Sequence, residues 1–515
     1  MIRINQMKLN IEHTSDDFER KILKTLCIKK EELQGFQIRK QSIDARKKPV
    51  LYYVYSVDVQ VRDEAKVKKT VKNNQIQFQV KPDSYHFEVK GTKELTHRPV
   101  IIGTGPAGLF CGYMLAAHGY QPILLERGAD VDQRTKDVEA FWENGQLNLS
   151  SNVQFGEGGA GTFSDGKLNT LVKDKFGRNH EVLRIFAEHG APESITYESK
   201  PHIGTDVLSA VVKEMRKYIC AHGGEVRFHS QVTDIQTHSD NGQKILRKLK
   251  IYDSQKKETY LLDTDLAVFA IGHSARDTFS MLYHHGLPMQ PKAFAVGVRI
   301  EHPQEMINQD QYGKNYPSFL PAAPYKLTAN LDNGRGVYTF CMCPGGYVVN
   351  ASSEEHRLAV NGMSYSRRDS QNANTAVIVT VSPDDFGSDH PLAGVEFQRK
   401  LEEAAYLEGN GKVPVQLFGD FCENRPSVQL GRVTPHIKGM YQLANVRNIF
   451  PEFIAESLTE GIQIFDHKLP GYARCDAVIS GVESRTSSPV RLTRDQSLQS
   501  EIRGIYPCGE GAGYA

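Results

Sequence analysis

The stretch Val100-Ile-Ile-Gly103-Thr-Gly105-Pro-Ala-Gly108 decides the fold of this chain. A short apolar strand runs into glycines spaced G-x-G-x-x-G, and a segment of helical period follows. Gly103 permits the tight turn, Gly105 lets the backbone approach a pyrophosphate, and Gly108 lets the helix pack against the sheet. The helix N-terminus would then hold the phosphates, because its N–H groups and dipole favour anions.

A second apolar strand, Pro122–Leu125, follows that helix and ends at Glu126. This is about the 20-residue spacing at which an acidic residue binds an adenosine ribose in such folds. The strand, turn, helix and second strand together form a βαβ start. We therefore expect a bound dinucleotide to contact Gly103, Gly105, Pro106, Ala107, Gly108, Glu126 and Arg127.

Composition is that of an ordinary globular protein with several domains. At about 100–200 residues per domain, the 515 residues allow two to four domains. Hydrophobic residues are 39%, charged residues are 24%, and the formal net charge is +1. No global field attracts nucleic acid or an anionic membrane. With sparse cysteines and no export signal at the start, we expect a soluble cytoplasmic protein.

The first 95 residues differ in pattern from the rest. Strands are expected at Ile2–Ile11, Gln37–Ile43 and Val50–Val61, with a helix at Phe18–Leu26. Basic runs lie at 46–48 and 66–72, and we expect solvated loops there, with RNA binding as the alternative. This segment is predicted to be a small α/β domain.

Two later stretches of the sequence indicate which dinucleotide is bound, because of what they resemble. Asp265–Gly272 is an apolar strand that ends in Ala270-x-Gly272, and Gly504–Gly513 is a strand with a Gly509-Glu510 turn. Both resemble segments of glutathione-reductase-like flavin domains. Residues 98–515 as a whole resemble a family of poorly characterised bacterial FAD-dependent dehydrogenases, the NAD/FAD-utilising dehydrogenases. The blocks that carry this resemblance are Phe155–Lys167, Gly272–Asp277, Lys292–His302, Cys341–Gly346, Asn361–Ser364 and Glu483–Arg491.

The resemblance implies FAD as the cofactor and adds binding residues. The glycine-rich loop at 156–166 can bring backbone N–H groups close to phosphate or to the flavin ring. The further cofactor-binding candidates are Gly159, Gly161, Ser164, Val232, Ala270, Gly272, Gly509 and Glu510.

Three side chains near these segments are candidates for catalysis. His273 and Arg276 follow the Ala270–Gly272 strand end, where a histidine could protonate a reduced substrate. Arg485 could hold a carboxylate or phosphate, and we expect it to line one cavity with His273. The alternatives are a structural histidine and structural ion pairs. No metal-ligand pattern is visible. The Cys341-Met-Cys343 pair would place two thiols on one strand face, although two small core residues are the simpler interpretation.

We therefore predict an α/β fold with a Rossmann-like FAD-binding domain, an inserted α+β cap and a small N-terminal α/β domain. The expected divisions are an N-terminal domain at 1–95, the first part of the FAD domain at 96–285, a cap or substrate domain at 286–480, and the rest of the FAD domain at 481–515. Because the superfamily continues into a helix after the Gly-Glu turn, we expect this chain to be truncated after Ala515 and Gly509–Ala515 to be poorly anchored.

The expected activity is that of an FAD-dependent oxidoreductase that transfers hydride through flavin to or from an unidentified small molecule. Free NAD(P)H is a candidate electron donor, and neither a membrane nor nucleic acid is expected as a partner. The alternatives are an FAD monooxygenase reduced by free NAD(P)H, a flavin-binding protein associated with RNA, and a flavin sensor without turnover. The pattern does not name the substrate, the electron acceptor or the oligomeric state.

Overall fold

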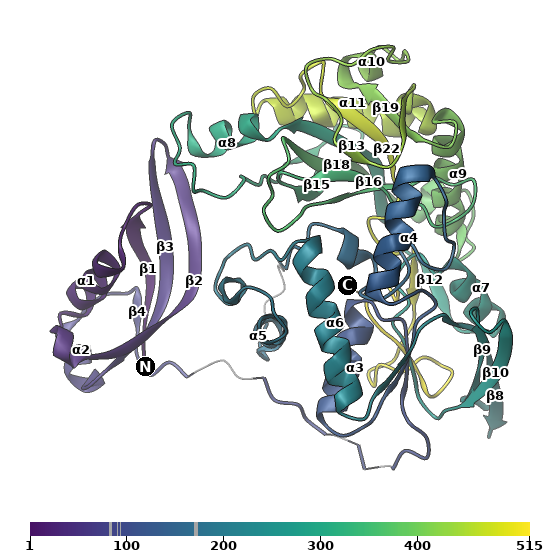
Figure 1. Ribbon diagram of the computed structural model, residues 1–515, viewed down its shortest axis with the longest axis horizontal. Helices are drawn as coiled ribbons and strands as arrows, with labels where there is room; N and C mark the ends of the chain where they lie inside the picture. Colours follow the sequence, from purple (N-terminus) through teal and green to yellow (C-terminus); the bar gives the residue numbers. More distant parts are fainter. Residues whose placement is uncertain (82–84, 90, 93, 169–173, 515) are drawn as a thin grey trace. The chain divides into compact units, whose positions relative to one another are not determined.

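A computed structural model describes residues 1–81, 85–89, 91–92, 94–168 and 174–514. The chain divides into two compact units (Figure 1). The first unit contains residues 1–90, 167–203 and 308–323, and the second contains residues 91–166, 204–307 and 324–515. The mixed α/β class is confirmed. The predicted domain boundaries stay a prediction, and the one at residue 480 falls inside a strand, β22 (Val478–Glu483).

The first unit is built on an antiparallel sheet with the order β2-β3-β1-β4. Helix α1 covers it with Phe18, Ile22 and Leu26, which pack against Val57 and Val59 of the sheet. The helix starts where it does because Thr14 and Asp17 form a capping box. The elements are β1 (Ile2–Asn10), α1 (Ser15–Leu26), β2 (Leu33–Lys47), β3 (Val50–Val61), α2 (Glu64–Thr70), β4 (Ile76–Gln77) and α5 (Arg178–Glu188).

The second unit contains a five-stranded parallel sheet with the order β24-β11-β5-β6-β7. Numbered along the chain, this is the order 3-2-1-4-5 of doubly wound dinucleotide-binding sheets. Helices α3 and α6 lie side by side next to this sheet (Figure 1), with Tyr113 stacked on Tyr218. The elements are β5 (Val100–Ile102), α3 (Pro106–Ala117), β6 (Ile123–Leu125), α6 (Thr205–Ala221), β7 (Glu225–Arg227), β11 (Ala267–Phe269) and β24 (Ile505–Pro507).

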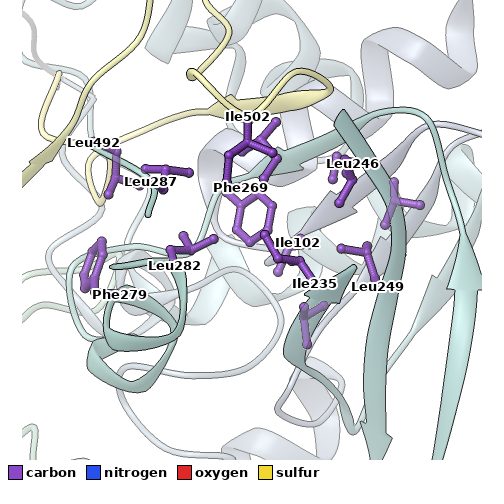
Figure 2. Packing of buried hydrophobic residues seen from close by; sticks show 14 of the residues in the cluster. Ile102, Ile235, Leu246, Leu249, Phe269, Phe279, Leu282, Leu287, Leu492 and Ile502 are labelled. Atoms are coloured by element: carbon purple, nitrogen blue, oxygen red, sulfur yellow. The ribbon is translucent and has the colours of Figure 1, made fainter. Parts of the chain in front are cut away.

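A hydrophobic core joins this sheet to an antiparallel hairpin formed by β8 (Ser230–Asp240) and β9 (Gln243–Asp253). Phe269 of β11 lies between Ile502 and Ile102, with Leu246 and Leu249 of the hairpin nearby (Figure 2). All are at least nine-tenths buried, which is worth about 1.5–3 kcal/mol for each large side chain. The remaining elements of this part are α4 (Val131–Asn144), β8 (Ser230–Asp240), β9 (Gln243–Asp253), β10 (Glu258–Asp263), α7 (Arg276–His284), β12 (Met289–Pro291) and β23 (Val490–Leu492).

The segment between β12 and β23 forms a seven-stranded, mostly antiparallel sheet with the order β14-β15-β18-β13-β22-β19-β21. Helices α9 and α11 pack on it (Figure 1). Its strands, in addition to β22, are β13 (Phe294–Pro303), β14 (Thr328–Asn330), β15 (Gly336–Cys343), β18 (Asn372–Val381), β19 (Val413–Leu417) and β21 (Tyr441–Leu443). A small sheet and the helices complete the list: β16 (Tyr347–Asn350), β17 (Val360–Met363), β20 (Ile437–Lys438), α8 (Gln304–Tyr312), α9 (Ala393–Glu408), α10 (Phe418–Cys422) and α11 (Glu452–Asp466).

The segment after β24 is held against the second unit. Ala512 is fully buried, its carbonyl accepts a hydrogen bond from the Leu492 N–H at 3.2 Å, and the Ser488 hydroxyl donates to the Gly511 carbonyl at 3.1 Å. The expectation that this segment is poorly anchored is therefore wrong for Gly509–Tyr514, because β23 supplies its packing partner. Ala515 lies outside the described residues.

Strand β13 carries a buried carboxyl, Glu301, whose titration is expected to make the free energy of unfolding depend on pH. Burial raises the pKa of Glu301 to about 7, although Asn372 Nδ2 and the His436 N–H both donate to its Oε2. Glu301 therefore binds a proton in the folded state over a range, about pH 4.5 to 7, where the unfolded chain has released it. The free energy of unfolding should fall by up to about 3 kcal/mol as pH rises through that range.

Glu301→Gln should remove this part of the pH dependence, because an amide oxygen can still accept both hydrogen bonds and does not titrate. Urea unfolding at several pH values measures it, with Glu403→Gln at a half-exposed position as the control. Parallel pH profiles for the wild type and the Glu301→Gln variant would contradict the assignment.

Candidate functional site

A cavity of about 470 Å³ lies at the carboxyl ends of the parallel strands. Its walls include the residues that directly follow β5, β6, β11 and β24, together with the glycine-rich loop. Open α/β sheets bind ligands at this edge, where the strand order reverses. In this sheet the reversal falls between β5 and β11, the neighbours that carry Gly103 and Ala270.

Most of the residues predicted from sequence line this one cavity. They are Gly103, Gly105, Pro106, Ala107, Glu126, Arg127, Gly159, Gly161, Val232, Ala270, Gly272, His273, Gly509 and Glu510. Segments far apart in the chain therefore converge as expected. The cavity also has walls that we did not predict, among them Gln154, Phe155, Ser230, Gln231, Ser274, Thr278, Thr486 and Cys508. Phe155 and Ser274 lie in the sequence blocks that carry the family resemblance, so that resemblance could have predicted them as cavity residues.

The turn after β5 has no room for larger side chains. Gly103 has a φ of +97°, and a Cβ there would lie 2.5 Å from the Ala270 carbonyl oxygen. A Cβ at Gly108, which is buried below the cavity, would lie 1.9 Å from the Gly103 carbonyl oxygen. Helix α3 starts at Pro106, so its first-turn N–H groups have no partner inside the helix and are available to an anion.

Glu126 joins the two glycine-containing segments. Its Oε2 accepts from the Thr104 N–H at 2.9 Å and the Thr104 hydroxyl at 2.8 Å, while its Oε1 accepts from the N–H groups of Gly128 and Gly156 at 2.9 and 3.0 Å. Four protein donors occupy about four lone-pair sites. The carboxylate therefore already fixes the turn and the loop, and its binding to a ribose stays a prediction.

Arg134 of α4, which sequence reasoning missed, organises the glycine-rich loop. Its side chain is fully buried and donates to the carbonyl oxygens of Asn152, Val153, Glu157 and Gly159 at 2.6 to 3.0 Å. Burial lowers its pKa to about 10, so it remains a cation at neutral pH. No local pattern marks this arginine, because its partners lie in a different segment.

His273 and Glu510 form a pair in the cavity wall. The His273 Nδ1 lies 2.9 Å from Glu510 Oε2. Burial alone would raise the pKa of Glu510, but the neighbouring His273 outweighs it and holds that pKa below its usual value. Among the residues that the structure describes, the buried His273 Nε2 and Glu510 Oε1 have no hydrogen-bond partner. A polar ligand in the cavity could satisfy both atoms, so these residues fit a bound dinucleotide.

The two predicted catalytic arginines do not line the cavity. Arg276 donates to Glu402 through Nη1 and Nη2 at 2.9 and 2.8 Å, and Arg485 donates to the same carboxylate through Nε and Nη2 at 2.9 and 2.8 Å. The expectation that Arg485 lines the His273 cavity is wrong, because Glu402 of α9 holds its guanidinium. Arg485 Nη1 is still 3.2 Å from the hydroxyl of Ser274, a cavity residue. Catalytic roles for the two arginines stay predictions.

Ser164 also lies outside the cavity wall. Its carbonyl accepts from the Thr205 hydroxyl at 2.9 Å, and its own hydroxyl lies 3.8 Å from Cys341 Sγ. It ends the 3₁₀ turn Ala160–Phe163 that follows Gly159. A direct contact of Ser164 with the cofactor stays a prediction.

Comparison with protein families identifies two parts of the chain. Residues 293–486 match the model "FAD-dependent protein, C-terminal domain-like", and residues 1–60 match a domain of unknown function (DUF8436). The first match, on a chain that also contains the dinucleotide-binding sheet, confirms FAD as the cofactor and places the protein among the flavoproteins.

A relative from Clostridium beijerinckii, described as an uncharacterized protein, is 49% identical over 520 residues. The similarity covers 100% of this chain and 95% of the relative. The chain belongs to the same family as this Clostridium protein.

Solved structures show lower similarity. The glycerol-3-phosphate dehydrogenase from Bacillus halodurans complexed with FAD is 13% identical, with a TM-score of 0.28, and covers 55% of this chain and 46% of its own. A flavoprotein/dehydrogenase from Cytophaga hutchinsonii is 11% identical, with a TM-score of 0.28, and covers 60% and 61%. TM-scores this low support no inference about function. Within the described ranges, no helix has the length and apolar character to span a bilayer.

Proposed function

We propose that this protein is an FAD-dependent oxidoreductase of the glutathione-reductase-like class, which acts on a small molecule with NAD(P)H as a free electron donor. The observation that carries the proposal is the cavity where Gly103, Gly272 and Gly509 converge beside the His273–Glu510 pair. FAD, when bound, supplies two-electron hydride chemistry. We also propose that the seven-stranded sheet forms the substrate-binding cap and that the protein acts in the cytoplasm.

The residues of the cavity have separate tasks in this proposal. The turn at Gly103 and the first turn of α3 would hold the pyrophosphate by N–H groups and the helix dipole. Arg134 fixes the glycine-rich loop through hydrogen bonds to its carbonyl oxygens. Glu510 orients the His273 ring through Nδ1, which leaves Nε2 to hold or deliver a proton to a substrate.

Anaerobic mixing of the purified flavoprotein with NADH or NADPH, and then with a panel of acceptors, tests the proposal. The flavin absorbance should bleach with one of the nucleotides and return with an acceptor. Rapid NADPH oxidation with peroxide release would instead favour the monooxygenase alternative. A flavin that neither nucleotide reduces would contradict the assignment of the donor.

The His273–Glu510 pair leads to a prediction that the same assay can test. His273→Gln should reduce turnover with the identified acceptor by about 100-fold, the usual size of a general-acid contribution, while the FAD content stays unchanged. His285→Gln is the matched control, since His285 also pairs with a carboxylate, that of Asp234, but is not part of the cavity wall. Equal losses in both variants would show that His273 acts only structurally.

A further inference from the structure

Two cysteines lie at the end of strand β15, close to the glycine-rich loop. Cys343 is fully buried, Cys341 is partly exposed, and both are thiols. The Cys341 side chain is close enough to be among the groups that raise the pKa of the Cys343 thiol. The Cys343 thiol in turn donates to the Cys341 carbonyl at 3.3 Å. The two sulfur-bearing side chains are therefore neighbours in space as well as in sequence.

A β-bulge interrupts the strand at this pair. In a regular strand, alternate Cα atoms are about 6.6 Å apart, which is near the upper limit of about 6.8 Å for a disulfide. In β15, Phe340 pairs with Ala376 and the next pairing is Cys343 with Asn374, so β15 accommodates one extra residue. Cys341 occupies the left-handed region with a φ of +43°. Bulges of this kind redirect side chains and are frequent beside active sites.

A buried guanidinium faces the pair. Arg299 Nη1 donates to the Cys341 carbonyl at 2.8 Å and lies 3.8 Å from Cys343 Sγ. Its Nε donates to Glu483 Oε2 at 2.7 Å. Burial raises the pKa of Cys343 and the arginine opposes that rise. The cation therefore offsets part of the effect of burial on the thiolate, although the pKa of Cys343 stays well above its usual value.

The pair lies one residue contact away from the segment that lines the cavity. Cys341 Sγ is 3.8 Å from the hydroxyl of Ser164, and Ser164 directly follows the turn whose first residues line the cavity. The more exposed thiol is thus the one that contacts Ser164.

We propose that Cys341 and Cys343 form a dithiol–disulfide pair that exchanges two electrons with the bound FAD. This inference rests on the proposed oxidoreductase function. In the oxidation, both S–H bonds break and one S–S bond forms. Two electrons and two protons leave the thiols, and FAD accepts them to become FADH2. The reverse step reduces the disulfide, so the pair stores a second electron pair beside the flavin.

Anaerobic dithionite titration of the air-oxidised holoprotein tests the pair. The wild type should take up twice as many reducing equivalents per FAD as Cys341→Ser or Cys343→Ser, because a disulfide and a flavin each take one electron pair. Cys27→Ser and Cys475→Ser, at exposed positions, should titrate like the wild type. Alkylation and mass spectrometry of the wild type should show Cys341 and Cys343 protected before reduction and modified after it, a readout independent of variant folding.

The possible results separate this inference from the proposed function. Equal uptake in the wild type and both variants, with both cysteines alkylated in the oxidised protein, would overturn the pair while leaving the oxidoreductase intact. A disulfide that remains when the flavin is fully reduced at equilibrium would overturn the exchange with FAD. Failure of NADH and NADPH to reduce the flavin, with the twofold uptake retained, would remove the proposed electron donor and support the pair.

Discussion

Glu402→Ala is expected to lower the free energy of unfolding of the second unit by about 3–5 kcal/mol, the cost of removing one partner from a buried ion pair. Glu402 is fully buried and its side chain accepts from Arg276, Arg485 and the Ser484 hydroxyl. The two arginine side chains are only 2% and 5% exposed, so the variant leaves two buried cations without a shared counter-ion. Of the two arginines, only Arg276 would keep Gln398 and Glu354 as partners.

Denaturant unfolding followed by the fluorescence of Trp142, the single tryptophan, measures this loss within the second unit. Glu403→Ala is the matched control, because Glu403 is the next residue of the same helix and pairs with Arg357 at a half-exposed site. Its cost should be below about 1 kcal/mol, as for other surface ion pairs. Similar losses in the two variants would mean that Glu402 does not hold the arginines.

Gly108→Ala is expected to weaken FAD binding by about 100-fold or more, equivalent to about 3 kcal/mol. Its Cβ would lie 1.9 Å from the Gly103 carbonyl oxygen, so α3 must shift away from the turn that we propose to hold the pyrophosphate. Equilibrium dialysis of reconstituted protein, or flavin fluorescence on titration, gives the affinity. Gly35→Ala, where a Cβ meets nothing within 4 Å, should bind FAD like the wild type.

Gly105→Ala separates damage to the fold from loss of ligand space. A Cβ there would meet only Gly159 Cα, at 3.7 Å, an ordinary contact. The protein should remain as stable as the wild type and yet bind FAD more weakly, because the methyl group would occupy the path of the pyrophosphate. Undiminished affinity in both glycine variants would place the phosphates elsewhere.

The sequence predicted best what depends on neighbours in the chain. Strand β3 has the predicted bounds, Val50–Val61, because its alternation is local. The stretch Glu225–Ile235 has strand character throughout, but it contributes to two strands in different sheets, β7 and β8, separated at His229 with a φ of +54°. A pattern of period two continues through such a break, so it does not report a change of sheet.

The residues of the candidate site divide in the same way, into those predictable from neighbours in the chain and those that depend on distant contacts. Gly103 and Gly272 were predictable, because each follows a recognisable strand. Arg485 was misplaced because its nearness to the Gly-Glu turn in sequence says nothing about Glu402. Glu402 and Glu403 are adjacent in one helix, yet one is fully buried and the other half-exposed. Only the distant arginines decide which carboxylate is buried, and no local pattern contains them.

The late position of β24 has a consequence for biosynthesis. Among the residues that the structure describes, this strand pairs only with β11, and the residues after it supply Gly509 and Glu510 to the cavity wall. A nascent chain in which Gly103 has already left the ribosome would still lack that wall until β24 is synthesised. Non-local pairing of this kind slows folding. The edge of β11 therefore stays open until β24 has been synthesised, and cofactor loading should follow the pairing of these two strands.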